Sequence, residues 1–142
     1  MTRAEKESGV VAAEAAIGML LLFFVIGVMW ALGRYVAAGQ GVDAAASDAA
    51  RAASLARSAG EAYGAAQSAA AATLADNDVP CDAPVIEIDT SGFAVPIGTP
   101  ATVSAHITCT VPLGDLTLPA TPGAVVLTGA AVSPLDTYRE RN

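Results

Sequence analysis

Residue types that support chemistry are few in this chain of 142 residues. His106 is the only histidine, and the alternation around it predicts a place on the polar side of a strand. Ser104 and Asp115 are close in sequence, but one strand and one loop do not make a catalytic triad. The sequence has no phosphate-binding glycine loop and no nucleophile elbow. It therefore predicts no catalytic residue, no metal site and no cofactor, and we do not expect an enzyme.

Cys81 and Cys109 are the only cysteines, and they do not form a C-x-x-C redox motif. Both follow the apolar segment described below. If the apolar segment crosses a membrane and the residues after it lie outside the cytoplasm, the oxidising conditions there favour a disulfide. The bridge would close a loop of about 28 residues and stabilise the domain by about 3–4 kcal/mol in the chain-entropy description. We predict this disulfide, and two free buried thiols are the alternative.

Composition excludes several classes of protein. The chain is 54% hydrophobic but only 5% aromatic, and much of its apolar content is alanine, which buries little area. A large core with a deep apolar pocket is therefore not expected. Seven Lys and Arg residues stand against fourteen Asp and Glu residues, a net charge of −7. Nucleic acid is not an expected partner, because such binding needs a basic surface.

Residues 15–33 form an uncharged apolar run. A bilayer is crossed by a helix of about 20 such residues. Trp30 and Tyr35 stand at the far end of the run, where aromatic rings favour the headgroup level. Arg34 can extend its charge to the same level. The run predicts a transmembrane helix and membrane lipid as a partner. A buried core helix is disfavoured, because little else in the chain could surround it.

Residues 35–76 contain no proline and are dominated by alanine, the strongest helix former. We predict a nearly continuous helix from the membrane segment to Asp76, with glycines as weak points where it could bend or break. Mostly small residues recur at spacings of 3 and 4. This stripe consists of Val42, Ala45, Ala49, Ala52, Ala56, Ala59, Tyr63, Ala66 and Ala70. We expect it to pack on a partner helix, and packing only on the chain's own C-terminal domain is the alternative. Gly33, Ala37 and Gly41 extend a ridge of small residues toward the membrane, a pattern that favours close helix contact in lipid.

After Pro80 the composition changes from alanine to Val, Ile, Thr, Pro and Gly. Residues 101–111 alternate between apolar and polar types, which predicts a half-buried strand. Further strands are predicted over 84–89 and 124–132, with a weaker one over 93–97. The expected fold is α+β: a long N-terminal helix followed by a small antiparallel β-sheet that packs on the helix end. The expected units are residues 1–9 as a leader, 10–34 as a transmembrane helix, 35–78 as an extracytoplasmic alanine-rich helix and 79–142 as a β domain.

The boundary between leader and apolar run carries a motif. The polar leader ends at Gly9, four small or apolar residues follow, and then comes Glu14. A carboxylate at the start of a membrane segment is costly, although the helix dipole favours an anion at an interfacial N-terminus. The arrangement resembles the processing site of type IV pilins. The resemblance implies that a prepilin peptidase cuts between Gly9 and Val10 on the cytoplasmic side. It also implies that Glu14 pairs with the freed amine, often that of a neighbouring subunit.

Within that superfamily the chain resembles the TadE-like minor pilins, or pseudopilins, of tight-adherence (Flp-type) pilus systems. The features that match are the residues from Gly9 to Glu14, the apolar span, Arg34-Tyr35, the segment 48–53 and the tail 128–139. The resemblance implies a single-pass cell-membrane protein with a cytoplasmic N-terminus and an extracytoplasmic sheet domain. It further implies a structural role in pilus assembly or adhesion, with other pilin subunits and the Tad-type assembly machinery as partners.

A second function class is open on the sequence: a secreted or membrane-anchored small binding protein of the cell envelope. Small residues before Gly39 would allow a signal peptidase to cut after Ala38. The apolar run is longer than the 7–15 residues typical of a signal peptide, and Arg34 interrupts the approach to that site. The N-terminal residue of the mature protein distinguishes the classes: Val10 for a pilin, Gly39 for a secreted protein, Met1 or Thr2 for an uncleaved anchor.

Overall fold

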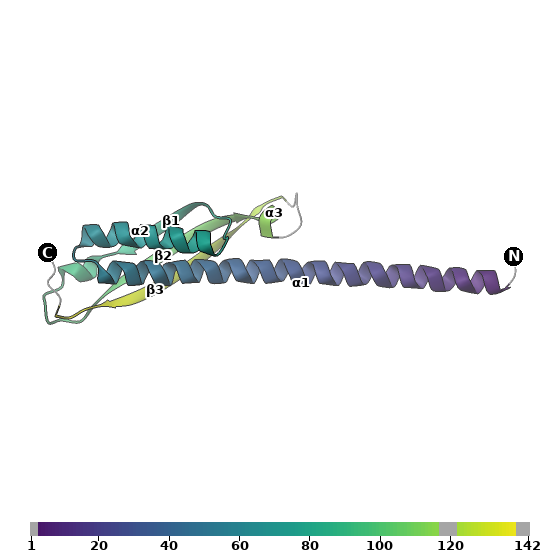
Figure 1. Cartoon of the computed structure of the whole chain (residues 1–142), viewed down its shortest axis with the longest axis horizontal. Coiled ribbons are helices and arrows are strands. Elements are labelled where there is room, and N and C mark those ends of the chain that lie inside the picture. The colour runs from purple at the N-terminus through teal and green to yellow at the C-terminus, as the bar shows by residue number, and fades with distance from the viewer. Residues whose placement is uncertain (1–2, 117–121, 139–142) are drawn as a thin grey trace.

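The computed structural model describes residues 3–116 and 122–138, with side chains described from residue 14 onward. Along the chain lie α1 (Arg3–Leu55), α2 (Ala59–Asp76), β1 (Asp82–Asp89), the 3₁₀ helix η1 (Ser91–Ala94), β2 (Ala101–Pro112), α3 (Leu113–Leu116) and β3 (Ala124–Leu135). Figure 1 shows α1 as a long rod whose N-terminal half projects alone, while α2 and the sheet lie along its other half. The predicted α+β fold, a long helix followed by a small antiparallel sheet, is confirmed.

The alanine-rich stretch forms two helices. α1 ends at Leu55, and α2 starts at Ala59 and runs back along α1 (Figure 1). The prediction of one nearly continuous helix to Asp76 is therefore wrong. Alanine favours helix everywhere in this stretch, so propensity alone does not show where one helix stops and the next begins.

A cap marks the start of α2. The Ser58 hydroxyl accepts a hydrogen bond of 3.3 Å from the Glu61 backbone N–H. The Glu61 carboxylate in turn accepts one of 3.0 Å from the N–H of Arg57. Serine followed three residues later by glutamate is the sequence signature of a capping box. In this chain the Glu61 carboxylate bonds the residue before the N-cap instead of the N-cap itself. The spacing of Ser58 and Glu61 was the sequence signal for the break.

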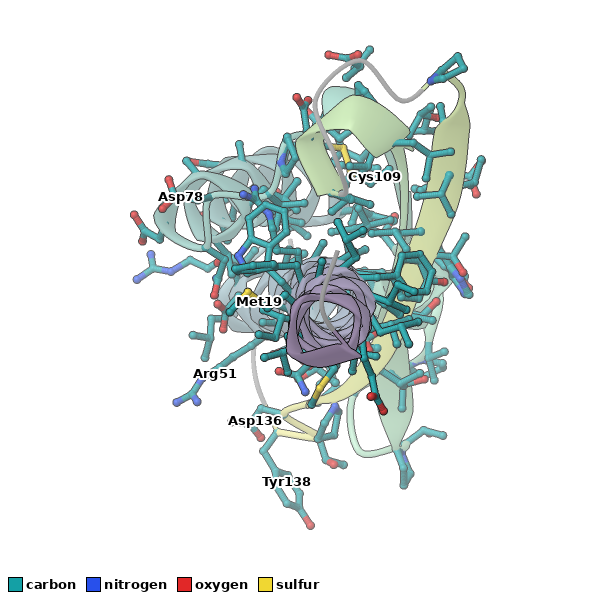
Figure 2. The ribbon with its side chains drawn as sticks, turned by 90° about the vertical axis from the view of Figure 1, so that its right-hand side faces the viewer. Met19, Arg51, Asp78, Cys109, Asp136 and Tyr138 are labelled. Carbon is teal, nitrogen blue, oxygen red and sulfur yellow. A yellow bond between two sulfur atoms is a disulfide. The ribbon has the colours of Figure 1, made fainter. Side chains whose placement is uncertain are left out.

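Small side chains let α2 and the sheet approach α1 closely. Figure 2, viewed along α1 from its N-terminal end, shows α2 on one side of α1 and the sheet on another. The buried residues of α1 are Ala38, Gly41, Val42, Ala45, Ala46, Ala49, Ala50, Ala53 and Ser54. Those of α2 are Ala62, Ala66, Ala70 and Leu74. The Thr73 hydroxyl donates a hydrogen bond of 2.7 Å to the Asp48 carboxylate, which links the two helices.

The predicted role of the alanine stripe therefore needs correction. Its buried members pack within this chain, where α1, α2 and the sheet meet, instead of on a partner helix. Tyr63, which the spacing placed in the stripe, is exposed on α2. A period of 3 and 4 specifies one face of a helix, but it does not specify what covers that face.

The sheet has β2 in the centre, with β1 and β3 antiparallel on either side. The three predicted strands are confirmed, and β3 runs further, to Leu135. The face of β2 predicted to be apolar is buried: Val103, Ala105, Ile107, Cys109 and Val111. The weaker strand expected over 93–97 is wrong, because η1 occupies part of it. The carboxylate of Asp89 accepts the N–H of Ser91 at 2.9 Å, and this hydrogen bond lowers the pKa of Asp89.

β3 and α1 approach each other closely at Gly129. A Cβ at Gly129 would lie 2.7 Å from the carbonyl oxygen of Val42 and 3.1 Å from the Cα of Asp43. Both are backbone atoms, which cannot rotate away as a side chain can. The absence of a side chain at Gly129 is therefore what allows the sheet to rest on α1.

We expect Gly129→Val to destabilise the packed part of the chain by about 3 kcal/mol, at the upper end of the usual cost of overpacking. The measurement is the urea midpoint of the detergent-solubilised protein. Ala130→Val is the matched control, because Ala130 is exposed on the same strand. Equal midpoints for the two variants would contradict the close approach.

Candidate functional site

The stretch of α1 that follows Glu14 carries large apolar side chains, and these are exposed. Its large side chains are 42–71% exposed: Ile17, Met19, Leu20, Leu21, Leu22, Phe23, Phe24, Val25, Ile26, Val28, Met29, Trp30 and Leu32. The most apolar stretch of this helix has a mean hydropathy of 2.5 and is 0% buried. We call residues 14–37 the free half of α1. A helix that is apolar all round is suited to lipid, and this one fits a single-pass membrane protein.

Two side chains mark the far end of the free half. The guanidinium carbon of Arg34 lies 5.2 Å from the centroid of the Trp30 ring. This is the distance of a cation–π contact, and a separation of four residues places both side chains on one side of the helix. Trp30 and Arg34 therefore form an aromatic and cationic end to the apolar segment.

The packed domain, which comprises residues 38–116 and 122–138, begins one turn beyond Arg34. Ala38 is 6% exposed and Val42 is 0% exposed. A Cβ at Gly41 would lie 2.5 Å from Cγ2 of Val79, so the connection from α2 to β1 crosses directly over α1 there. The sequence predicted that a ridge of small residues up to Gly41 is open to another helix in lipid. This prediction is wrong at Gly41, because the chain itself covers that residue. At Gly33 a Cβ would meet nothing within 4 Å.

Glu14 lies at the opposite end of the free half and is exposed. About 20 residues separate it from Arg34, which is about 30 Å along a helix, the thickness of a hydrocarbon core. Glu14 and Arg34 are therefore spaced to sit at opposite faces of one bilayer. Gly9 and Val10 lie within α1, in the stretch whose burial and contacts are not described.

Cys81 and Cys109 are joined by a disulfide, with their Cα atoms 5.4 Å apart. Cys81 directly precedes β1, and Cys109 is fully buried on the face of β2 toward the helices (Figure 2). The bond thus ties the connection that leaves α2 to the central strand. The predicted pairing is present, and the alternative of two free thiols is not.

We expect loss of this disulfide to destabilise the packed domain by about 2–4 kcal/mol and to leave membrane insertion unchanged. The test compares the urea midpoints of Cys81→Ala, Cys109→Ala and the double variant with that of the wild type. The double variant controls for the free thiol that each single variant leaves. Two reactive thiols per chain in unreduced, denatured wild-type protein would show that the bond does not form.

His106, the one histidine, is exposed on β2. Its neighbours across the sheet are Glu87 on β1 and Ala130 on β3. Over residues 3–116 and 122–138, no group of three or more His, Cys, Asp or Glu is arranged to hold a metal ion. The candidate functional site therefore consists of residues of α1 and of the surface where α1 enters the packed domain.

Comparison with known protein families finds a match in the N-terminal part of the chain. Residues 9–51 fit the family described as TadE-like protein. The matched range starts at Gly9, includes Glu14 and the whole free half, and ends within α1. The resemblance inferred from the sequence is confirmed over this range. No curated protein and no solved structure matches the chain.

Proposed function

We propose that this TadE-like protein is a minor structural subunit of a Flp- or Tad-type pilus, acting in pilus assembly or adhesion. The family match supports association with a Tad pilus system. The observation that carries the proposal is the division of α1 into a free apolar half and a half packed in a folded domain. Such a helix can be held by lipid before assembly and by the helices of other subunits afterwards. Its role is structural and not catalytic.

The leader, residues 1–9, lies in the cytoplasm, and the packed domain lies outside the membrane. A prepilin peptidase cuts between Gly9 and Val10 and leaves an ammonium group on Val10. Glu14 is one helical turn further on, on the same side of the helix. When subunits leave the membrane, this carboxylate pairs with the amine of Val10 in the same or a neighbouring chain. The pairing offsets the cost of removing both charges from water.

N-terminal sequencing of the protein purified from membranes tests this function. A chain that begins at Val10 and copurifies with an Flp-type major pilin or assembly ATPase is the expected result. A chain that still begins at Met1 or Thr2 would contradict the processing.

The second candidate, a secreted binding protein of the cell envelope, is favoured by one observation. The free half ends at Ala37 and the packed domain starts at Ala38, so a signal peptidase that cuts after Ala38 would leave the folded part almost whole. Sequencing that finds Gly39 at the N-terminus would show that the protein is secreted and would exclude the pilin.

A further inference from the structure

A pocket of about 160 Å³ opens where α1 enters the packed domain. It lies between α1, the connection from α2 to β1, and α3. Its lining residues are Arg34, Ala37, Ala38, Asn77, Asp78, Pro80 and Leu116. In Figure 1 the C-terminal end of α2 and α3 lie at the end of the packed domain from which the free half projects. The pocket is therefore on the surface that faces the membrane in the proposed function.

The level at which the pocket lies relative to the bilayer follows from the length of the apolar run. The uncharged residues end at Gly33, and Arg34 is the next residue. A run of about 20 residues spans about 30 Å, the full hydrocarbon thickness. Arg34 and the pocket beside it then lie at the level of the lipid headgroups. Trp30, whose ring lies against the Arg34 guanidinium, is suited to the same level.

The two walls of the pocket carry opposite charges. Arg34 on α1 provides an exposed guanidinium, which binds phosphate well. Asp78 on the facing wall provides an exposed carboxylate, and the C-terminal end of α2 beside it is the negative end of the helix dipole. A ligand that carries only negative charge suits one wall and is repelled by the other. A phosphate joined to an ammonium group suits both.

The wall that carries Asp78 is held in place by backbone contacts. Asp78 has a left-handed conformation, with φ of 49°. Its N–H donates to the carbonyl of Ala75 at 3.1 Å, and the N–H of Val79 donates to that of Leu74 at 3.0 Å. This pair of bonds is the Schellman motif that ends many helices. Since Val79 also packs on Gly41 of α1, the motif fixes the position of Asp78 relative to Arg34.

We propose that this pocket binds the headgroup of a zwitterionic aminophospholipid of the phosphatidylethanolamine class. The Arg34 guanidinium contacts the phosphate, and the Asp78 carboxylate contacts the ammonium group. The acidic surroundings, which include Asp76, Asp82 and Asp115, disfavour anionic lipids. The inference rests on the membrane placement in the proposed function. Its consequence is that a bound lipid sets the height of the packed domain above the bilayer.

Trp30 is the only tryptophan, so its fluorescence reports on lipid next to the pocket. The full chain is reconstituted in phosphatidylcholine vesicles that contain a small fraction of one lipid with acyl chains brominated near the headgroup. Brominated phosphatidylethanolamine, phosphatidylcholine and phosphatidylglycerol are compared. We expect phosphatidylethanolamine to be enriched about fivefold over phosphatidylcholine at Trp30, since partly exposed charge pairs contribute modestly. We expect phosphatidylglycerol to be enriched at Trp30 less than phosphatidylethanolamine is.

Asp78→Asn removes the charge, and asparagine accepts the left-handed conformation, so the turn is kept. We expect this variant to lose the preference for phosphatidylethanolamine over phosphatidylcholine. Asp76→Asn is the matched control, because it makes the same charge change two residues away outside the pocket lining. We expect it to retain the preference.

The outcomes separate the pocket from the membrane placement. An equal loss in both variants, no preference in the wild type, or a greater preference for phosphatidylglycerol would each overturn the aminophospholipid site. In all three cases a vesicle made wholly of brominated lipid still quenches Trp30, and the membrane placement stands. If that vesicle does not quench Trp30, the placement itself is wrong and the pocket proposal falls with it.

Discussion

A Gly9→Val variant is expected to accumulate as a full-length precursor, with no detectable chain that begins at Val10. Glycine lacks a Cβ, so a protease can approach the backbone at this position without meeting a side chain. The branched side chain of valine blocks that approach. The measurement is the intact mass of the protein purified from cells that contain a prepilin peptidase, in which the precursor retains the mass of nine leader residues.

Gly18→Val is the matched control for this variant. Gly18 lies in the free half of α1, and a Cβ there meets nothing within 4 Å. The same substitution at Gly18 should leave processing and insertion unchanged. If the Gly9→Val protein still matures to Val10, the assigned cleavage site is wrong.

Glu14→Ala is expected to abolish incorporation into pili while membrane insertion stays equal or improves. Removal of a charge from the edge of a membrane segment lowers the cost of insertion. In the proposed fibre the same change leaves the ammonium group of a processed Val10 without its proposed partner, and an unpaired buried charge costs about 3–5 kcal/mol. A penalty of this size corresponds to more than a hundredfold loss of assembly. The measurement is the ratio of protein in sheared pili to protein in the membrane fraction.

Two further variants isolate the role of the Glu14 charge. Glu14→Gln keeps the size of the side chain and should fail as Glu14→Ala does. Glu87→Ala removes an exposed carboxylate from β1 and should assemble normally. Wild-type amounts of the Glu14→Ala protein in pili would reduce Glu14 to an interfacial residue with no part in assembly.

The features that the sequence determined by itself are those set by local pattern. The apolar run after Glu14 indicates a membrane helix by length and composition alone. The alternation from Val103 to Val111 indicates both the strand and its buried face, because side chains on a strand point to opposite sides in turn. Pro80 and the change in composition after it separate the helical part from the sheet. The family motif depends on Gly9 and Glu14, which are close in sequence.

The break between α1 and α2 depended on a weaker signal. Alanine is compatible with helix on both sides of Ser58, so the spacing of small residues continues without a break along the sequence. In the structure the stripe is divided between α1 and α2. Only the capping pair Ser58 and Glu61 marks the start of a new helix, and it contributes about 1 kcal/mol. Once α2 folds back, the stripe is covered by its own chain.

Contacts between distant segments were decided by the tertiary structure alone. Gly129 is an ordinary strand glycine in sequence, and its role appears only where β3 meets the backbone of α1 at Val42. Arg34 and Asp78 line one pocket because the turn that ends α2 packs on Gly41 of α1 through Val79. Residue type fixes the charge at each position, but the path of the chain decides which charges share a surface. That path is set by packing among many residues, which no local period or spacing records.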